Sequence, residues 1–350
     1  MLTKRTVEIV KSATPVLAER GLDVTLRMYH LLFSENPEVL SLFNRTNQTT
    51  QRLPQALARA LYAYAANIDN LGALSGAVEL ITNKHVSLGV KPEHYGIVGR
   101  HLIQALRDVL QIDEEQVAAW KEAYGFLAEI LVNAEQKLYQ QTETQDGGWA
   151  DYRTFILDKK VKESEVITSF YLKPKDGGKV AAFKPGQYIT VKIDFPGGKV
   201  VTRNYSLSDS PNGEYYRVSI KKERRPVDKN DLPDGLVSCY LHDHYQPGME
   251  LQLRAPMGNF VLDPHTQRPV VLLSGGVGLT PLVSMLKTIV HQHPKLETWF
   301  IHGALNRRTH AMRDQIQNLA ALNPNIHVYF CYSEPDAEDL KSCDQTGFIT

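Results

Sequence analysis

The stretch QQTETQDGGW at residues 140–149 divides this chain of 350 residues into two kinds of sequence. Its polar residues and two adjacent glycines interrupt the regular apolar pattern that precedes them, which is typical of a linker. We therefore expect one domain to end near residue 140 and a new domain to begin near Asp151.

Upstream of this stretch, apolar residues recur every three or four positions, which is the spacing of one face of a helix. The series Leu57, Leu61, Tyr64 and Ile68 is one example, and similar series run through residues 22–33, 78–88, 95–109 and 120–138. Asn36-Pro37 is typical of a helix start, because an N-cap residue precedes a proline in the first turn. These patterns predict an all-α domain of about six or more helices over residues 1–140.

Downstream, short runs of β-branched and aromatic residues alternate with glycine-containing turns. Runs at residues 166–172, 188–193 and 215–220 predict an antiparallel β-barrel domain over residues 151–263. A buried strand, a glycine-rich turn and a helix follow from residue 268, and two further strands end at Tyr332. This order is typical of an α/β domain, which we place at residues 268–350 with three parallel strands.

The composition is that of an ordinary globular protein, with 39 basic and 39 acidic residues and 43% hydrophobic residues. Without a basic excess there is no electrostatic reason to bind nucleic acid or an anionic membrane, so we expect small-molecule partners and no obligatory membrane association. We also expect a monomer. The first residues lack the apolar core of a signal peptide, which favours a cytoplasmic protein. Three scattered cysteines, Cys239, Cys331 and Cys343, are expected to be reduced thiols.

His85 lies on the apolar face of its expected helix, and Glu135 lies on the apolar face of the last helix of the first domain. A histidine in such a place is either a hydrogen-bonded core residue or a metal ligand. A buried carboxylate requires a donor, and Tyr95 heads an apolar series that could supply one. A His-Tyr-Glu cluster would make an iron-bound imidazole more basic. The alternative places Glu135 at a solvated edge and makes Tyr95 an ordinary core residue.

Several segments, in this order and spacing, resemble the globin domain of bacterial flavohemoglobins. They are Phe43-Asn44, residues 64–68, Lys84-His85, residues 92–99 and residues 120–125. The resemblance implies a haem b group with His85 as the proximal iron ligand, Tyr95 and Glu135 as its hydrogen-bonded partners, and Tyr29 as the hydroxyl facing bound O₂. It also implies a haem pocket formed by Phe43, Leu53, Leu57 and Lys84. Flavohemoglobins usually have glutamine where this chain has Leu53, which removes a second polar group from the distal side.

Arg203-Asn204-Tyr205-Ser206 lies on an expected strand, and such a tetrapeptide alone also fits an exposed strand with a charged face. Together with two further segments, it resembles the flavin site of ferredoxin reductase-like modules. In that resemblance the arginine neutralises the FAD pyrophosphate, and the tyrosine and serine contact the isoalloxazine. The FAD residues so implied are Gln187, Tyr188, Arg203, Asn204, Tyr205, Ser206, Gly235, Val237 and Ser238.

The glycine-rich turn between the first strand and helix of the third domain is either a tight βα turn or a place where backbone approaches a pyrophosphate. After the flavin motifs, it resembles the nicotinamide dinucleotide site of the same reductases. The residues implied are Gly275, Gly276, Val277, Gly278, Leu279, Thr280, Pro281 and His302. Asn306, Arg307 and Arg308 follow the next strand, where no acidic residue marks a ribose hydroxyl, so NADH and NADPH both remain open.

The resemblance implies a nitric oxide dioxygenase that converts NO and O₂ to nitrate with NAD(P)H, through FAD and haem. Family members continue beyond Thr350 with a Cys-Gly-Pro strand and an aromatic tail, so we expect an incomplete third domain. That expectation leaves an alternative, a haem O₂-binding protein whose reductase module is inactive. A third possibility, a haem-free flavin reductase, requires the matches at His85, Phe43 and Tyr29 to be coincidental.

Overall fold

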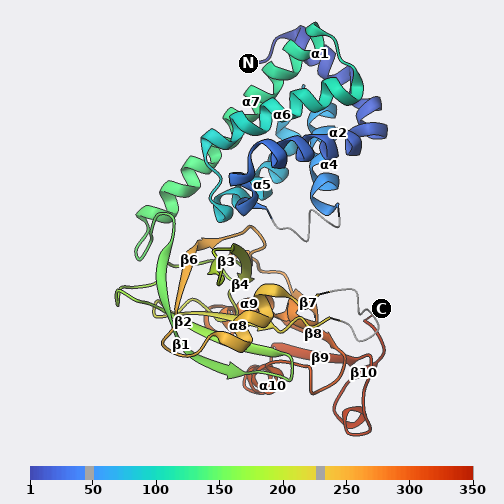
Figure 1. Ribbon diagram of the computed structural model, residues 1–350. Helices are drawn as coiled ribbons and strands as arrows, with labels where there is room; N and C mark the ends of the chain where they lie inside the picture. The colour runs from blue at the N-terminus through green and yellow to red at the C-terminus, as the bar shows by residue number, and fades with distance from the viewer. Residues whose placement is uncertain (44–50, 226–232, 350) are drawn as a thin grey trace. The chain divides into compact units, whose positions relative to one another are not determined.

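A computed structural model describes residues 1–43, 51–225 and 233–349, and the chain divides into two compact units, Met1–Gln141 and Thr142–Thr350 (Figure 1). Among the described residues, the first unit has one buried apolar cluster and the second has two. Asn44, which forms part of one flavohemoglobin-like segment, lies outside the described residues.

The first unit is helical, as the spacing of its apolar residues predicts. Its elements are α1 (Lys4–Ser12), α2 (Thr14–Glu35), η1 (Pro37–Leu42), α4 (Arg52–Ala66), η2 (Leu71–Leu74), α5 (Ser75–Leu88), α6 (Pro92–Leu110) and α7 (Glu114–Thr144). Helix α2 packs against both α4 and α6. Together with α7 they form a core whose fully buried side chains include Met28, Leu32, Leu106 and Trp120. Burial of these faces, rather than local propensity alone, holds the short helices in place.

The linker begins later than the sequence predicts. Helix α7 continues to Thr144, so the expectation that residues 140–144 belong to a linker is wrong. These residues are polar but include no helix breaker. The chain turns instead at Gly147, where φ is +70° and a Cβ atom would approach the backbone of Val180 to 2.7 Å, so only glycine fits.

The second unit begins with a six-stranded antiparallel sheet. Its strands are β1 (Arg153–Lys162), β2 (Ile167–Pro174), β3 (Tyr188–Asp194), β4 (Val200–Ser206), β5 (Tyr216–Lys221) and β6 (Glu250–Met257), in the order β4-β3-β6-β1-β2-β5. An isolated bridge between Leu207 and Val218 joins the two ends of the sheet, which closes it into the predicted barrel. Helix α8 (Leu236–His244) packs on the barrel through Val237 and Leu241.

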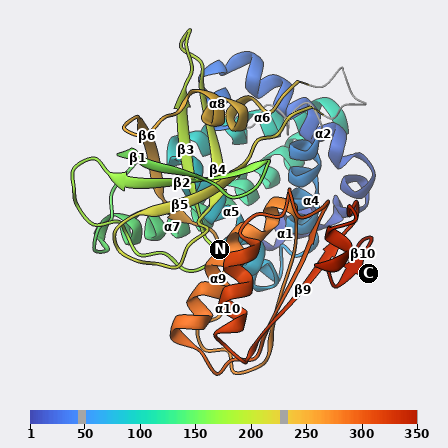
Figure 2. The same ribbon diagram turned by 90° about the horizontal axis from the view of Figure 1, so that it is seen from below.

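A parallel sheet with strand order β10-β9-β8-β7 completes the second unit. It contains β7 (Val270–Gly275), β8 (Thr298–Ala304), β9 (Ile326–Tyr332) and β10 (Gln345–Thr346), with η3 (Gly276–Gly278), α9 (Leu279–Gln292), α10 (Arg313–Ala321) and η4 (Asp339–Lys341) between them. The α/β prediction is confirmed, but the predicted count of three strands omits the two-residue strand β10. Helices α9 and α10 contact each other and lie against one face of this sheet (Figure 2).

Candidate functional site

Three helices of the first unit bring His85, Tyr95 and Glu135 together. The Nδ1 atom of His85 on α5 lies 2.7 Å from the Oε1 atom of Glu135 on α7 and 3.0 Å from the hydroxyl of Tyr95 on α6. The Tyr95 hydroxyl donates to the same Glu135 oxygen at 2.5 Å. The cluster expected from the sequence therefore exists.

Glu135 is buried, because only 3% of its side chain is exposed. The alternative that placed it at a solvated edge is wrong. Burial and the hydrogen bond to Glu135 together raise the pKa of the Tyr95 hydroxyl, which therefore stays protonated as a donor. A buried carboxylate that accepts two hydrogen bonds satisfies the requirement that buried charge be paired.

The His85 ring leaves its second nitrogen available. Its Nδ1 atom faces Glu135, while Nε2 has no hydrogen-bond partner among the described residues, and 32% of the side chain is exposed. A core histidine would have both nitrogens satisfied or enclosed. An imidazole with one nitrogen fixed by a carboxylate and the other free is the arrangement that a metal-ligating histidine requires. The donor set therefore fits a haem iron.

Tyr95 is itself held by the neighbouring helix. The Tyr124 hydroxyl on α7 donates to the backbone oxygen of Tyr95 at 2.8 Å. The Tyr124 ring reaches this position because Gly99 has no side chain: a Cβ atom there would lie 2.4 Å from the ring. Tyr124 and Gly99 lie in two of the segments that resemble flavohemoglobins, but no local pattern in the sequence predicts a role for either.

Tyr29 lies in an aromatic group within the core of the first unit. Its ring stacks on Phe33 at 5.4 Å and meets Phe43 edge-on at 5.8 Å, measured between ring centroids. Its hydroxyl has no hydrogen-bond partner among the described residues, and burial raises its pKa. Leu53 and Leu57 pack against the same core, whereas Lys84 is exposed. A hydroxyl without a partner in the described chain fits a site whose ligand supplies the acceptor.

In the barrel, the flavin-like tetrapeptide lies on β4 beside β3. Tyr188 pairs with Ser206, and Thr190 pairs with Asn204, whose side-chain oxygen accepts a bond from the Thr190 hydroxyl at 3.1 Å. Gln187, before β3, donates to the backbone oxygen of Gly258 at 3.1 Å. The register therefore places the predicted residues of the two segments next to each other.

Arg203 is half-buried and makes a 2.8 Å bond only to the backbone oxygen of Thr202 among the described residues. Burial lowers the pKa of its guanidinium, and no carboxylate of the described chain lies within ion-pair distance of it. Such a group favours an anionic partner. Tyr205, two residues after Arg203, packs against the barrel core, where burial raises the pKa of its hydroxyl.

The segment Gly235 to Ser238 forms the start of helix α8, with Gly235 at the N-cap. Backbone amides in the first turn of a helix have no acceptor within the helix, so they can bind a phosphate. The hydroxyl of Ser238, one of the implied FAD residues, accepts from the Glu223 amide at 3.3 Å and donates to the Gly235 oxygen at 3.2 Å. The helix start fits the pyrophosphate of FAD, with the amides as donors.

The glycine-rich turn joins β7 to α9 and includes the short helix η3. Gly276 has φ +53°, and no atom lies within 4 Å of the position that a Cβ atom would take. The backbone there is open on the side where a ligand would approach, and the amides of Leu279 and Thr280 begin helix α9. Pro281 occupies the first turn of α9, where its missing N–H costs nothing. These features fit a dinucleotide pyrophosphate.

The side chain of His302 lies in the protein core and not in the predicted nucleotide site. This residue lies within β8 and its side chain is fully buried, with Nδ1 2.8 Å from the Ser274 hydroxyl on β7. Burial lowers the pKa of His302 to about 4, so its ring is neutral. The prediction that this side chain lines the nucleotide site is therefore wrong, because alternation along β8 turns it toward the side of the sheet that α9 and α10 cover.

Three family models match the chain: a globin over residues 26–131, an oxidoreductase FAD-binding domain over residues 154–262 and an oxidoreductase NAD-binding domain over residues 272–350. A flavohemoprotein of Bacillus thuringiensis subsp. konkukian is 49% identical over 352 residues, which cover all of this chain and 87% of that protein. The chain belongs to the flavohemoprotein family. A flavohemoprotein of Rhodopirellula baltica is 47% identical and 86% covered.

Solved structures agree with the flavohemoprotein fold. A flavohemoglobin of Malassezia yamatoensis with bound FAD and heme superimposes with a TM-score of 0.85 at 23% identity, over 99% of this chain and 88% of that one. The FAD/NAD-binding domain of a nitric oxide dioxygenase from Vibrio cholerae matches 57% of this chain and 79% of its own, with a TM-score of 0.51 and 35% identity.

Family membership confirms the predicted fold class and the cofactor set of haem, FAD and a nicotinamide dinucleotide. This flavohemoprotein is accordingly an oxidoreductase. The roles of individual residues at the three sites, the domain boundaries and the monomeric state stay predictions. Within the described parts of the chain, no helix has the length and apolar character needed to cross a membrane.

Proposed function

We propose that this flavohemoprotein is a nitric oxide dioxygenase, which converts NO and O₂ to nitrate with electrons from NAD(P)H. Nitrate formation from NO and O₂ requires one additional electron for each NO, and a hydride carries two electrons. The chain combines the domains that such a reaction needs: a globin, an FAD-binding barrel and an NAD-binding domain. The name of the similar reductase structure from Vibrio cholerae supports the same activity.

The observation that carries this proposal is the hydrogen-bonded chain from Glu135 to His85. A globin that only stores or senses O₂ does not require a buried carboxylate behind its proximal ligand. Here the carboxylate lies 2.7 Å from Nδ1 of His85 and pulls on the proton of that nitrogen, which makes Nε2 a stronger electron donor. Strong donation toward iron favours activation of O₂ over simple reversible binding.

Each cofactor supplies chemistry that the side chains lack: haem provides a redox-active iron, and FAD converts a hydride into single electrons. In our proposal Nε2 of His85 would hold the iron, and the Tyr29 hydroxyl would donate a hydrogen bond to a bound oxygen molecule from its aromatic surroundings. A donor fixed in advance by packing stabilises developing negative charge without reorganising. Phe33 and Phe43 fix Tyr29 in this way.

The second unit would hold the two nucleotides. Arg203 and the first turn of α8 would hold the FAD pyrophosphate, and Tyr205 and Ser206 on β4 would contact the flavin ring. The turn at Gly276 and the start of α9 would hold the pyrophosphate of the nicotinamide dinucleotide. Two positively charged side chains, Arg307 and Arg308, follow β8, so neither NADH nor NADPH is disfavoured by charge.

The test uses the full chain loaded with haem and FAD. We expect NO to accelerate NADH oxidation under O₂, with one nitrate formed per NO and two per NADH. Oxidation of the haem without nitrate would contradict the proposal. In a second arm NADH is added without O₂ or NO: bleaching of the flavin followed by haem reduction supports a complete electron path. If dithionite reduces the haem and NADH leaves both cofactors oxidised, the chain is an O₂-binding protein instead.

A further inference from the structure

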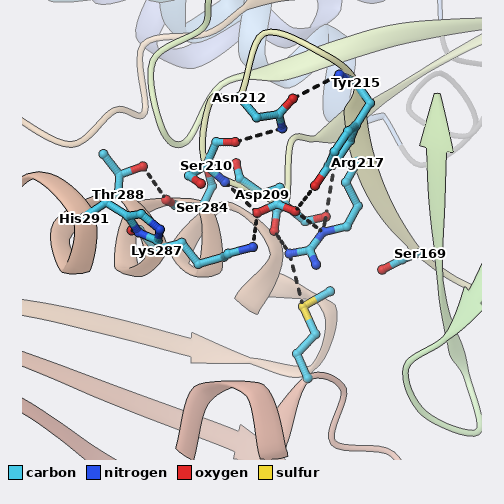
Figure 3. A network of polar contacts seen from close by, with 12 residues as sticks. Ser169, Asp209, Ser210, Asn212, Tyr215, Arg217, Ser284, Lys287, Thr288 and His291 are labelled. Carbon is cyan, nitrogen blue, oxygen red and sulfur yellow. Dashed lines mark hydrogen bonds and ion pairs between the residues drawn. The ribbon is translucent and has the colours of Figure 1, made fainter. Parts of the chain in front are cut away.

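Asp209 lies three residues after the flavin-binding tetrapeptide, in the loop that leaves β4, and the reaction described above gives it no role. It is 4% exposed. A buried aspartate needs strong partners, because an unpaired carboxylate in the interior is costly. Some of its partners lie nearby in the chain, and others come from helix α9, as Figure 3 shows.

Both carboxylate oxygens of Asp209 are satisfied. Oδ1 accepts from the Lys287 ammonium and from the Ser210 amide at 2.9 Å, and Oδ2 accepts from the Tyr215 hydroxyl at 3.1 Å. The Nε atom of Arg217 lies 3.6 Å from Oδ2. The backbone oxygen of Asp209 is also engaged, because it accepts from the Ser284 hydroxyl at 2.7 Å (Figure 3).

The network buries charged side chains, which is costly unless they are paired. The side chains of Asp209, Arg217 and Lys287 are 6%, 2% and 17% exposed. Burial alone would raise the pKa of Asp209, but the charge of Arg217 and the bond to Lys287 outweigh it and lower that pKa, so the carboxylate stays ionised. Buried ion pairs often add little net stability. What a fully satisfied network does provide is one defined geometry.

That geometry joins the two nucleotide sites. Asp209 continues the strand that carries Arg203 and Ser206, whereas Ser284 and Lys287 lie on α9, the helix whose first turn follows Gly276. A second contact also joins the barrel to the parallel-sheet part: Nη2 of Arg217 on β5 lies 3.9 Å from the sulfur of Met312, the N-cap residue of α10. The barrel and the parallel sheet are therefore fastened beside the predicted flavin and dinucleotide positions.

We propose that Asp209 is a positioning residue for hydride transfer, which through Lys287 and Ser284 fixes helix α9, and with it the nicotinamide, relative to the flavin strand. Hydride transfer requires close approach of donor and acceptor, and a displacement of about 1 Å can lower a rate about 100-fold. The proposal rests on the FAD and NAD sites of the proposed function but not on nitrate formation.

The test removes the link without leaving an unpaired buried charge. Lys287→Met leaves Asp209 paired with Arg217, whereas replacing Asp209 would leave two cations facing each other. We expect the limiting rate of anaerobic flavin reduction at saturating NADH to fall about 10- to 100-fold. The dissociation constant for NADH and the flavin midpoint potential should stay near the wild-type values. Lys295→Met, which removes an exposed lysine just beyond α9, is the matched control.

Ser284→Ala gives an independent variant, because it removes the bond to the Asp209 backbone and keeps all charges. It should also lower the limiting rate of flavin reduction. If Lys287→Met fails to retain FAD, the rate of the Ser284 variant tests the proposal instead. Hydrogen exchange gives a readout without catalysis: amides of residues 206–210 and 276–283 should exchange faster in both variants. The proposal is overturned if the limiting rate and this exchange stay at wild-type values. It is also overturned if NADH does not reduce the wild-type flavin, whereas loss of nitrate formation alone leaves it standing.

Discussion

Glu135 and His85 are 50 positions apart in the sequence, yet the Glu135 carboxylate lies 2.7 Å from Nδ1 of the His85 ring. The contact fixes the orientation of the ring and the nitrogen that carries its proton. Because Nδ1 faces the carboxylate, Nε2 is the nitrogen left available to bind iron. The electronic character of the histidine is therefore set by α7, a helix that carries no predicted iron ligand.

Glu135→Gln should weaken this effect with little change in shape. An amide oxygen still accepts from Nδ1 but carries no full charge, so Nε2 donates less electron density. We expect the haem midpoint potential to rise and NO-dependent turnover to fall about 10- to 100-fold. A spectroelectrochemical titration measures the potential. Glu129→Gln alters an exposed glutamate of the same helix and should leave it unchanged.

Tyr29→Phe removes one hydroxyl and keeps the ring that packs against Phe33 and Phe43. If that hydroxyl stabilises the oxygen ligand, O₂ should dissociate faster and turnover should fall about 100- to 1,000-fold, the usual cost of losing one such donor. Stopped-flow displacement of O₂ checks the first expectation. Tyr62→Phe, at a tyrosine that is 40% exposed, is the control. Equal O₂ release from the Tyr29 variant and wild type would remove Tyr29 from the mechanism.

Elements with strong periodicity could be predicted from the sequence. The apolar series of α4, α6 and α7 mark helices because each buries one face, and the strands β2, β3 and β5 fall within a residue or two of their expected positions. The predicted cluster of His85, Tyr95 and Glu135 formed for the same reason. Each of the three residues lies on the face of its helix that turns toward the other two.

Other features depend on contacts between distant segments and leave no periodic signal. Strand β10 consists of two residues that pair with Cys331 and Tyr332, which no local pattern indicates. His302 follows the alternation of β8, but its burial depends on which face the helices cover. Asp209 resembles an ordinary turn aspartate in the sequence. Its role becomes visible only when Lys287, 78 residues later, lies against it.

Gly99 and Gly96 offer a paired test of packing on α6. A methyl group at Gly99 would lie 2.4 Å from the Tyr124 ring, whereas at Gly96 it would meet nothing within 4 Å. Gly99→Ala should therefore destabilise the first unit by about 1–3 kcal/mol through overpacking. Gly96→Ala should stabilise it by about 0.5–1 kcal/mol, because alanine is the better helix former. Urea unfolding followed by helical circular dichroism compares them, and equal shifts in the two variants would contradict the tight contact.

Two buried histidines should make the second unit sensitive to acid. The rings of His302 and His310 lie 4.5 Å apart between centroids, and burial lowers their pKa values to about 4 and about 2. In the unfolded chain both would titrate near 6.5. Above that pH neither state binds the protons, so no stability is lost. As the pH falls below about 6.5, the unfolded chain takes up protons that the folded chain refuses, and stability declines.

The expected slope is about 1.4 kcal/mol per pH unit for each histidine, between about pH 6 and the lower folded pKa values. His302→Asn keeps a polar group beside Ser274 and removes one titrating site, so the slope should decrease by about that amount even if the variant is less stable at pH 7. Urea unfolding of the full chain at pH 7, 6 and 5, followed by hydrogen exchange of the β8 amides, measures it. His265→Asn, at an exposed histidine, should retain the wild-type slope. An unchanged slope in His302→Asn would mean that the acid sensitivity comes from other groups.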